Sequence, residues 1–98
     1  MARLDPVVVH ELTYALPHVF PMSRLEIAEY IKTVLTWESV DALGGKEPLI
    51  MALTFWTEHG IAFADALLAA RALQGGTIVT TENVKDILKV GALATRPG

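Results

Sequence analysis

The stretch from Phe63 to Asp86 constrains the fold of this chain more than any other segment does. It reads FADALLAARALQGGTIVTTENVKD: an apolar run, a glycine pair, and five consecutive β-branched residues from Thr77 to Thr81. The apolar run predicts a helix over about 63–74 that is buried on two sides. The β-branched run predicts a buried strand, because such side chains are stiff and suit a pleated surface. Together they form half of a βαβ layer, so we expect an α/β fold with a mainly parallel sheet.

A first helix is predicted ahead of this unit. Asp5 is a good N-cap and Pro6 a good first helical residue, so the helix should cover about residues 7–16 and end at Pro17. Three consecutive valines leave open that this segment is instead the end of a strand. Glu11 borders the apolar stripe that the helix would bury, which consists of Val8, Leu12, Ala15 and Leu16.

The middle of the chain predicts two more helices around a short strand. Ser23 and Glu26 form a capping box at the start of one helix, whose expected buried face is Leu25, Ala28, Ile31 and Leu35. The alternation over residues 39–43 predicts a strand closed by a glycine pair. A third helix should run from Pro48 to about His59, with Gly60 as its left-handed C-cap and an inner face of Leu49, Ala52, Leu53 and Trp56. Trp37 and Trp56 are expected in the core or in an interface.

The C-terminal end predicts a short α/β unit. Asn83 is a plausible N-cap for a helical turn that ends near Leu88, and residues 91–94 are expected to form an edge strand.

Composition narrows the class of protein. The 98 residues make one domain, 1–98, and 52% of them are hydrophobic, so part of this surface should be buried against another chain. No stretch approaches the roughly 20 apolar residues of a membrane span, no signal peptide is apparent, and cysteine is absent; these features fit a cytoplasmic protein. The net charge of −3 argues against a broad basic surface for nucleic acid.

Three carboxylates stand where chemistry is expected in an α/β fold. Asp65 is in the first turn of an apolar helix, Asp86 follows a strand, and Glu11 borders an apolar stripe. Clustered carboxylates can hold Mg²⁺ or Mn²⁺ and activate water for phosphodiester hydrolysis. Each acid also has a simpler explanation, since Asp65 suits the helix dipole, Asp86 can be a solvated residue and Glu11 can extend from the stripe into solvent. The three histidines match no metal motif.

Three blocks resemble the later conserved blocks of PIN domains: VVVHEL (7–12), FADALLAA (63–70) and VTTENVKD (79–86). The resemblance implies an αβα sandwich and a Mg²⁺- or Mn²⁺-dependent endoribonuclease. Many such proteins are VapC-type toxins that pair with an antitoxin protein and are often dimeric. It carries catalytic and metal-binding roles to Glu11, Asp65 and Asp86, and a metal-binding role to Asn83. Asn83 stands where the family has an acid or sometimes Asn, and Thr81 matches a Thr or Ser that we assign to the substrate.

The chain departs from the PIN pattern at its N-terminus. The family begins with a central strand that ends in a metal-binding Asp, whereas Met1 to Leu4 leave no room for a core strand and Asp5-Pro6 does not replace that Asp. We therefore expect an N-terminally truncated version of the fold. The alternatives are a catalytically inactive PIN-like module for oligomerisation or binding, and a small structural protein with no site. Unpaired strand edges predict a homodimer or a higher oligomer.

Overall fold

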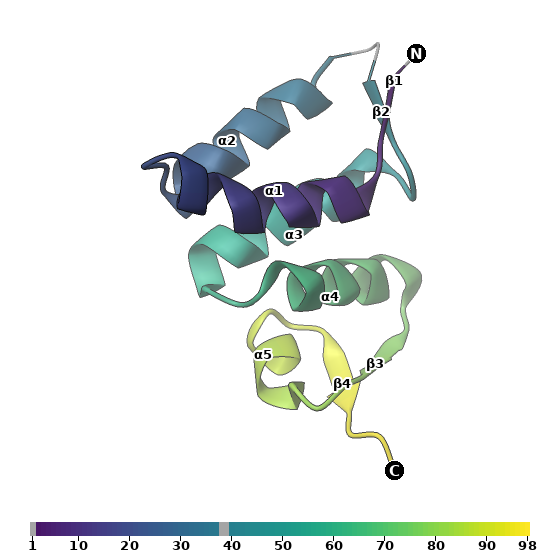
Figure 1. Cartoon of the computed structure of the whole chain (residues 1–98). Coiled ribbons are helices and arrows are strands. Elements are labelled where there is room, and N and C mark those ends of the chain that lie inside the picture. The colour runs from purple at the N-terminus through teal and green to yellow at the C-terminus, as the bar shows by residue number, and fades with distance from the viewer. Residues whose placement is uncertain (1, 38–39) are drawn as a thin grey trace.

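The computed structural model describes residues 2–37 and 40–98 and has a mixed α/β fold in which helices predominate (Figure 1). In chain order the elements are β1 (Ala2–Leu4), α1 (Pro6–Val19), α2 (Arg24–Leu35), β2 (Val40–Ala42), α3 (Lys46–His59), α4 (Phe63–Gly75), β3 (Ile78–Thr80), α5 (Val84–Lys89) and β4 (Leu93–Thr95). No helix in the described part of the chain is both long enough and apolar enough to cross a membrane.

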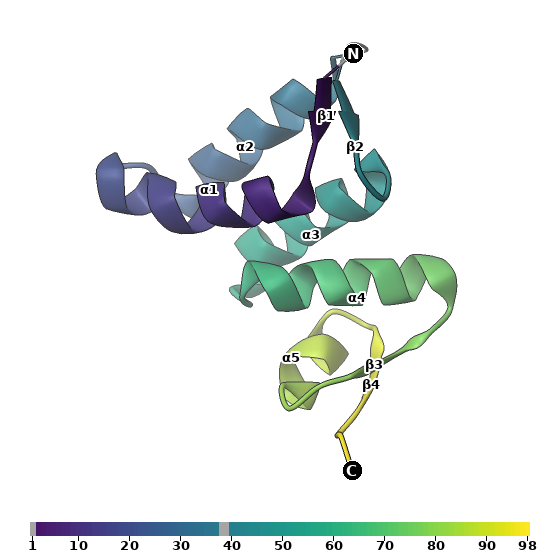
Figure 2. The same ribbon diagram turned by 45° about the vertical axis from the view of Figure 1, so that its right-hand side comes forward.

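The strands form two separate parallel pairs. β1 pairs with β2 so that Leu4 lies opposite Ala42, and β3 pairs with β4 so that Thr80 lies opposite Thr95. The prediction of parallel strands is confirmed, but the described residues contain no single continuous sheet. Figure 2 shows the first pair beside α2 and α3 and the second pair on the other side of α4.

β1 shows that residues 2–4 form a short strand, although not the central core strand for which the sequence left no room. The segment is too short for a central strand, but it needs only one neighbour, and β2 supplies it. The pairing continues one residue further, where the Leu43 N–H donates to the Leu4 carbonyl at 3.0 Å. The strand predicted over 39–43 is observed as Val40–Ala42, and Ser39 lies outside the described residues.

α1 begins as predicted but is longer and rotated. The Asp5 carboxylate caps it by accepting the Val7 N–H at 2.8 Å. The prediction that Pro17 ends the helix is wrong, because a proline in the last turn removes only its own hydrogen bond and the helix continues to Val19. The predicted stripe is also wrong in part: Val8 and Ala15 are exposed, while the buried residues of the helix are Pro6, Val9 and Thr13.

α2 confirms the capping box and corrects one core residue. The Ser23 hydroxyl accepts the Glu26 N–H at 3.2 Å, and the Glu26 carboxylate accepts the Ser23 N–H at 3.1 Å. Leu25 was expected in the core but is 61% exposed. Ile27 is buried instead, because the inner face begins after the first turn and consists of Ile27, Ala28, Ile31 and Leu35.

α4 lies between two hydrophobic clusters, as the apolar run predicted. Ala66 and Ala70 belong to the larger cluster, with the inner faces of α2 and α3. Ala69 and Ala72 belong to a smaller cluster that contains Val79, Ile87 and Ala92. The expected inner face of α3 is confirmed, since Leu49, Ala52, Leu53 and Trp56 are all buried. Trp37, by contrast, is 54% exposed.

β3 is less buried than its sequence predicted. Only Val79 is buried, and Ile78 is 59% exposed. The reason is that the β3–β4 pair is covered on one face, toward α4 and α5, so alternate side chains point to solvent. β4 forms near the predicted edge strand and ends at Thr95.

Candidate functional site

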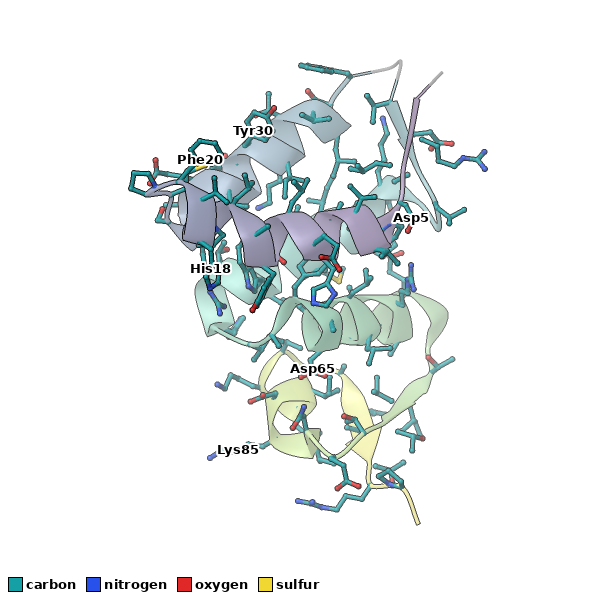
Figure 3. The ribbon with its side chains drawn as sticks, in the orientation of Figure 1. Asp5, His18, Phe20, Tyr30, Asp65 and Lys85 are labelled. Carbon is teal, nitrogen blue, oxygen red and sulfur yellow. The ribbon has the colours of Figure 1, made fainter. Side chains whose placement is uncertain are left out.

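Asp65 and Asn83 are the two candidate residues that the fold joins directly. Asp65 is half-buried in the first turn of α4, as predicted, and Asn83 stands between β3 and α5. The Asn83 Nδ2 donates to Asp65 Oδ2 at 3.0 Å, although 18 positions separate the two residues. Figure 3 shows Asp65 on the side of α4 that faces α5. The N-terminal end of a helix is a favourable place for a carboxylate, because the helix dipole is positive there.

Thr81 holds the loop that presents Asn83. Its hydroxyl accepts the Asn83 N–H at 3.0 Å, and its own N–H donates to the Thr95 carbonyl on β4 at 2.9 Å. Asn83 occupies the N-cap position of α5 as predicted, but its side chain makes no cap hydrogen bond there. The amide is directed to Asp65 instead, so the residue acts on the candidate site rather than on its own helix.

In the described part of the chain, the side chains of Asp86 and Glu11 make no hydrogen bond to Asp65 or Asn83. Asp86 is half-buried in the first turn of α5, and its N–H donates to the Asn83 carbonyl at 3.2 Å. Glu11 is exposed on α1, next to His10. Within residues 2–37 and 40–98, no three histidine or acidic side chains lie close enough together to hold a metal ion.

The donor chemistry at Asp65 nevertheless fits a weakly held hard cation. Asp65 accepts from Asn83 through one oxygen, which leaves Oδ1 free, and the Asn83 carbonyl oxygen is a second donor of the kind that Mg²⁺ takes. Mg²⁺ commonly binds to one or two carboxylates and keeps several waters. The residues therefore fit a largely hydrated ion and not a closed cage of protein ligands.

Two cavities flank the stacked rings of His10 and Phe63, whose centroids are 6.2 Å apart. One cavity, of about 560 Å³, is mainly apolar and opens between Asp5, Leu43 and the outer side of α4. The other, of about 430 Å³, lies between α1, the start of α2 and the junction of α3 with α4.

Sequence reasoning missed the second cavity. Its polar and aromatic lining includes Tyr14, His18 and Arg24. The spacing of His10, Tyr14 and His18 at i, i+4 and i+8 would have placed three rings on one face of α1 if the helix had been extended past Pro17.

Comparison of the chain with family models, with curated proteins and with solved structures found no match. The PIN resemblance thus stands on the three sequence blocks alone.

Proposed function

We propose that this chain is a Mg²⁺- or Mn²⁺-dependent endoribonuclease of the PIN type, with Asp65 as its central site residue. The observation that carries the proposal is the hydrogen bond between Asn83 and Asp65, at the N-terminal end of α4. It joins two of the three sequence blocks that resemble PIN domains. A carboxylate fixed at this place by an amide is a suitable ligand for a hard cation.

The residues around Asp65 have distinct parts in this proposal. Asn83 orients the carboxylate, and Thr81 keeps Asn83 in place through its hydroxyl. By the resemblance, Glu11 on α1 and Asp86 on α5 are the other two acids of the site, although the described residues do not bring all three acids around one ion. When bound, the metal ion would neutralise phosphate charge and activate a water molecule for hydrolysis. The carboxylate of Asp65 repels a phosphodiester, so an ion of this kind is needed for the RNA backbone to approach Asp65 itself.

The proposal extends to partners by the same resemblance. A VapC-type ribonuclease would act in the cytoplasm and be restrained by an antitoxin protein. The exposed strand edges of two short parallel pairs support a homodimer or higher oligomer, since bare edges accept further strands.

The test is cleavage of a defined RNA in Mn²⁺ by the purified chain and by Asp65→Asn. Glu58→Gln, a change of one exposed acid at the end of α3, is the matched control for the lost charge. We expect cleavage by the wild type and by Glu58→Gln, and at least about a hundredfold loss in Asp65→Asn, the size seen when one electrostatic group is removed from an active site. Equal cleavage by all three proteins would point to a contaminating nuclease and refute the proposal.

A second candidate is a catalytically inactive module for oligomerisation or binding. It is favoured by the lack of a three-ligand group among the described residues and by the large solvent-accessible surface area of the chain. The chain exposes 5974 Å², whereas a folded monomer of this mass exposes about 5,500 Å². A crystal soaked in Mn²⁺ separates the two candidates, because ordered metal at Asp65 supports the nuclease and its absence at saturating metal supports the inactive module.

A further inference from the structure

Three ring side chains form a stripe along one face of α1. His10, Tyr14 and His18 are spaced four residues apart, so they stack along the helix, and all three are exposed. Tyr14 and His18 have ring centroids 4.9 Å apart, and His10 is stacked on Phe63 at 6.2 Å. The stripe therefore places three exposed rings in one line along the helix.

The ring of His18 is held in a defined orientation. Its Nδ1 lies 2.7 Å from the Tyr14 carbonyl oxygen, and because a carbonyl can only accept, Nδ1 carries the hydrogen. Nε2 then remains for a ligand. Figure 3 shows His18 at the end of α1, on the side away from Tyr30 of α2.

Arg24 adds a fixed positive charge to the cavity of about 430 Å³ that the α1 rings also line. Its Nη1 donates to the Trp56 carbonyl at 3.1 Å and to the Ile61 carbonyl at 3.3 Å. Its guanidinium carbon lies 4.9 Å from the centre of the Trp56 ring, which is a cation–π distance. Three N–H donors remain on Nη2 and Nε, in the planar geometry that suits a phosphate.

This cavity has the size and charge for a nucleic-acid ligand. Its volume of about 430 Å³ is within the range of ligand pockets. None of its described lining residues is acidic, although the chain as a whole is, and Arg24 makes the lining positively charged. The larger cavity is mainly apolar, and its lining contains both Asp5 and Arg71, so it offers a phosphate less complementarity than the smaller cavity does.

We propose that the α1 ring stripe and Arg24 bind single-stranded RNA, with unpaired bases on Tyr14 and His18 and a phosphate on Arg24. Stacking on aromatic rings combined with a cation for the backbone is the usual way in which proteins hold single strands. This cavity adjoins the candidate site, because Phe63 lines it and precedes Asp65 by two positions on α4. The choice of RNA as the strand rests on the proposed function, whereas the binding geometry does not.

The test is fluorescence anisotropy with a labelled RNA hexamer in EDTA, so that no metal-dependent cleavage can occur. Loss of one stacked base corresponds to about 5- to 150-fold weaker binding, and we expect a loss in this range for Tyr14→Ala. Tyr14→Phe keeps the ring and should bind as the wild type does. Tyr30→Ala is the matched control. Tyr30 is 62% exposed against 69% for Tyr14, but it lies on α2 and does not line the cavity.

Two further measurements sharpen the test. Duplex RNA of the same sequence should bind at least about fivefold more weakly, because its bases are already stacked. The logarithm of the binding constant should fall with the logarithm of salt concentration at a slope of about −0.7, as expected for a single strand with one phosphate contact.

The inference is overturned if Tyr14→Ala binds as tightly as the wild type, if Tyr30→Ala weakens binding equally, or if duplex and single strand bind alike. These outcomes are separable from the proposed nuclease. A chain that binds the hexamer through Tyr14 but cleaves no RNA in Mn²⁺ keeps this inference and loses the proposed function. If Tyr14→Ala cleaves and binds RNA as well as the wild type does, the proposed function is kept and this inference is lost.

Discussion

Ile87 is the residue whose truncation most directly tests how the C-terminal unit is held on α4. It is completely buried in the smaller cluster, whose other members are mostly alanines, so it supplies much of the apolar volume there. Ile87→Ala removes three carbon groups, which is about 2.4 kcal/mol in transfer free energy. The residual cavity raises the expected loss in the free energy of unfolding to about 3–4 kcal/mol, within the range for such truncations.

The matched control is Leu88→Ala, which removes as many carbons from the next position of α5. Leu88 is 52% exposed, so its truncation should cost less than about 1 kcal/mol. Urea unfolding followed by circular dichroism gives both values. With a slope of about 1.5 kcal/mol per molar urea, the Ile87→Ala midpoint should fall by about 2 M and that of Leu88→Ala by well under 1 M. Equal shifts in the two variants would refute the argument that this cluster holds the unit in place.

Two other predictions concern the start of α2 and the assembly. Ser23→Ala should lower the free energy of unfolding by about 1 kcal/mol, because it removes the hydroxyl that accepts the Glu26 N–H. Thr33→Ala, at an exposed position of the same helix, should lower it by less. A larger loss in Thr33→Ala would contradict the capping argument. Light scattering at micromolar concentration should give a homodimer or larger assembly, since strand edges and side chains such as Phe20 and Tyr30 are exposed, and a monomer would contradict this.

Helix ends that carry a clear capping residue were predictable because they depend on neighbouring residues. The start of α3 was not, since the helix begins at Lys46 and not at the predicted Pro48. Asp5, Ser23 and Gly60 all act at their helix ends as the sequence indicated, through hydrogen bonds or backbone angles set within a few positions. The buried face of α1 was not predictable in the same way. Val7, Val8 and Val9 are equally hydrophobic, so nothing local decides which of them faces the core, and only Val9 does.

The pairing of strands was beyond local reasoning. β1 has three residues, too few for a periodic pattern, and it exists because β2, nearly forty positions later, pairs with it. The division into two parallel pairs depends likewise on where α4 sits, between the clusters. The sequence indicated parallel strands and a doubly buried α4 and gave no information about the break between the pairs.

The candidate site was predictable in its residues more than in its contacts. Asp65 was predicted from its place at the start of an apolar helix and from the resemblance, and Asn83 from the resemblance. Their hydrogen bond across 18 positions follows from α4 packing on the β3–α5 loop. The part that Arg24 plays was not predictable, because it depends on carbonyls 32 and 37 positions away in the sequence. A side chain that bridges distant backbone leaves no periodic signal, so sequence alone does not reveal it.

The first turn of α4 and the ring stripe of α1 suggest that one strand of RNA would be bound and cleaved by different residues. Asp65 faces the C-terminal unit, while Phe63, two residues earlier, faces the ring stripe of α1. Each residue of an α-helix is rotated by about 100° from the one before it. Phe63 and Asp65 are two positions apart, so their side chains lie on opposite sides of the first turn of α4. A single strand bound across the start of α4 would thus meet stacking rings on one side and the oriented carboxylate on the other. Binding without metal and cleavage with metal should then depend on different residues, with Tyr14 affecting the first and Asp65 the second.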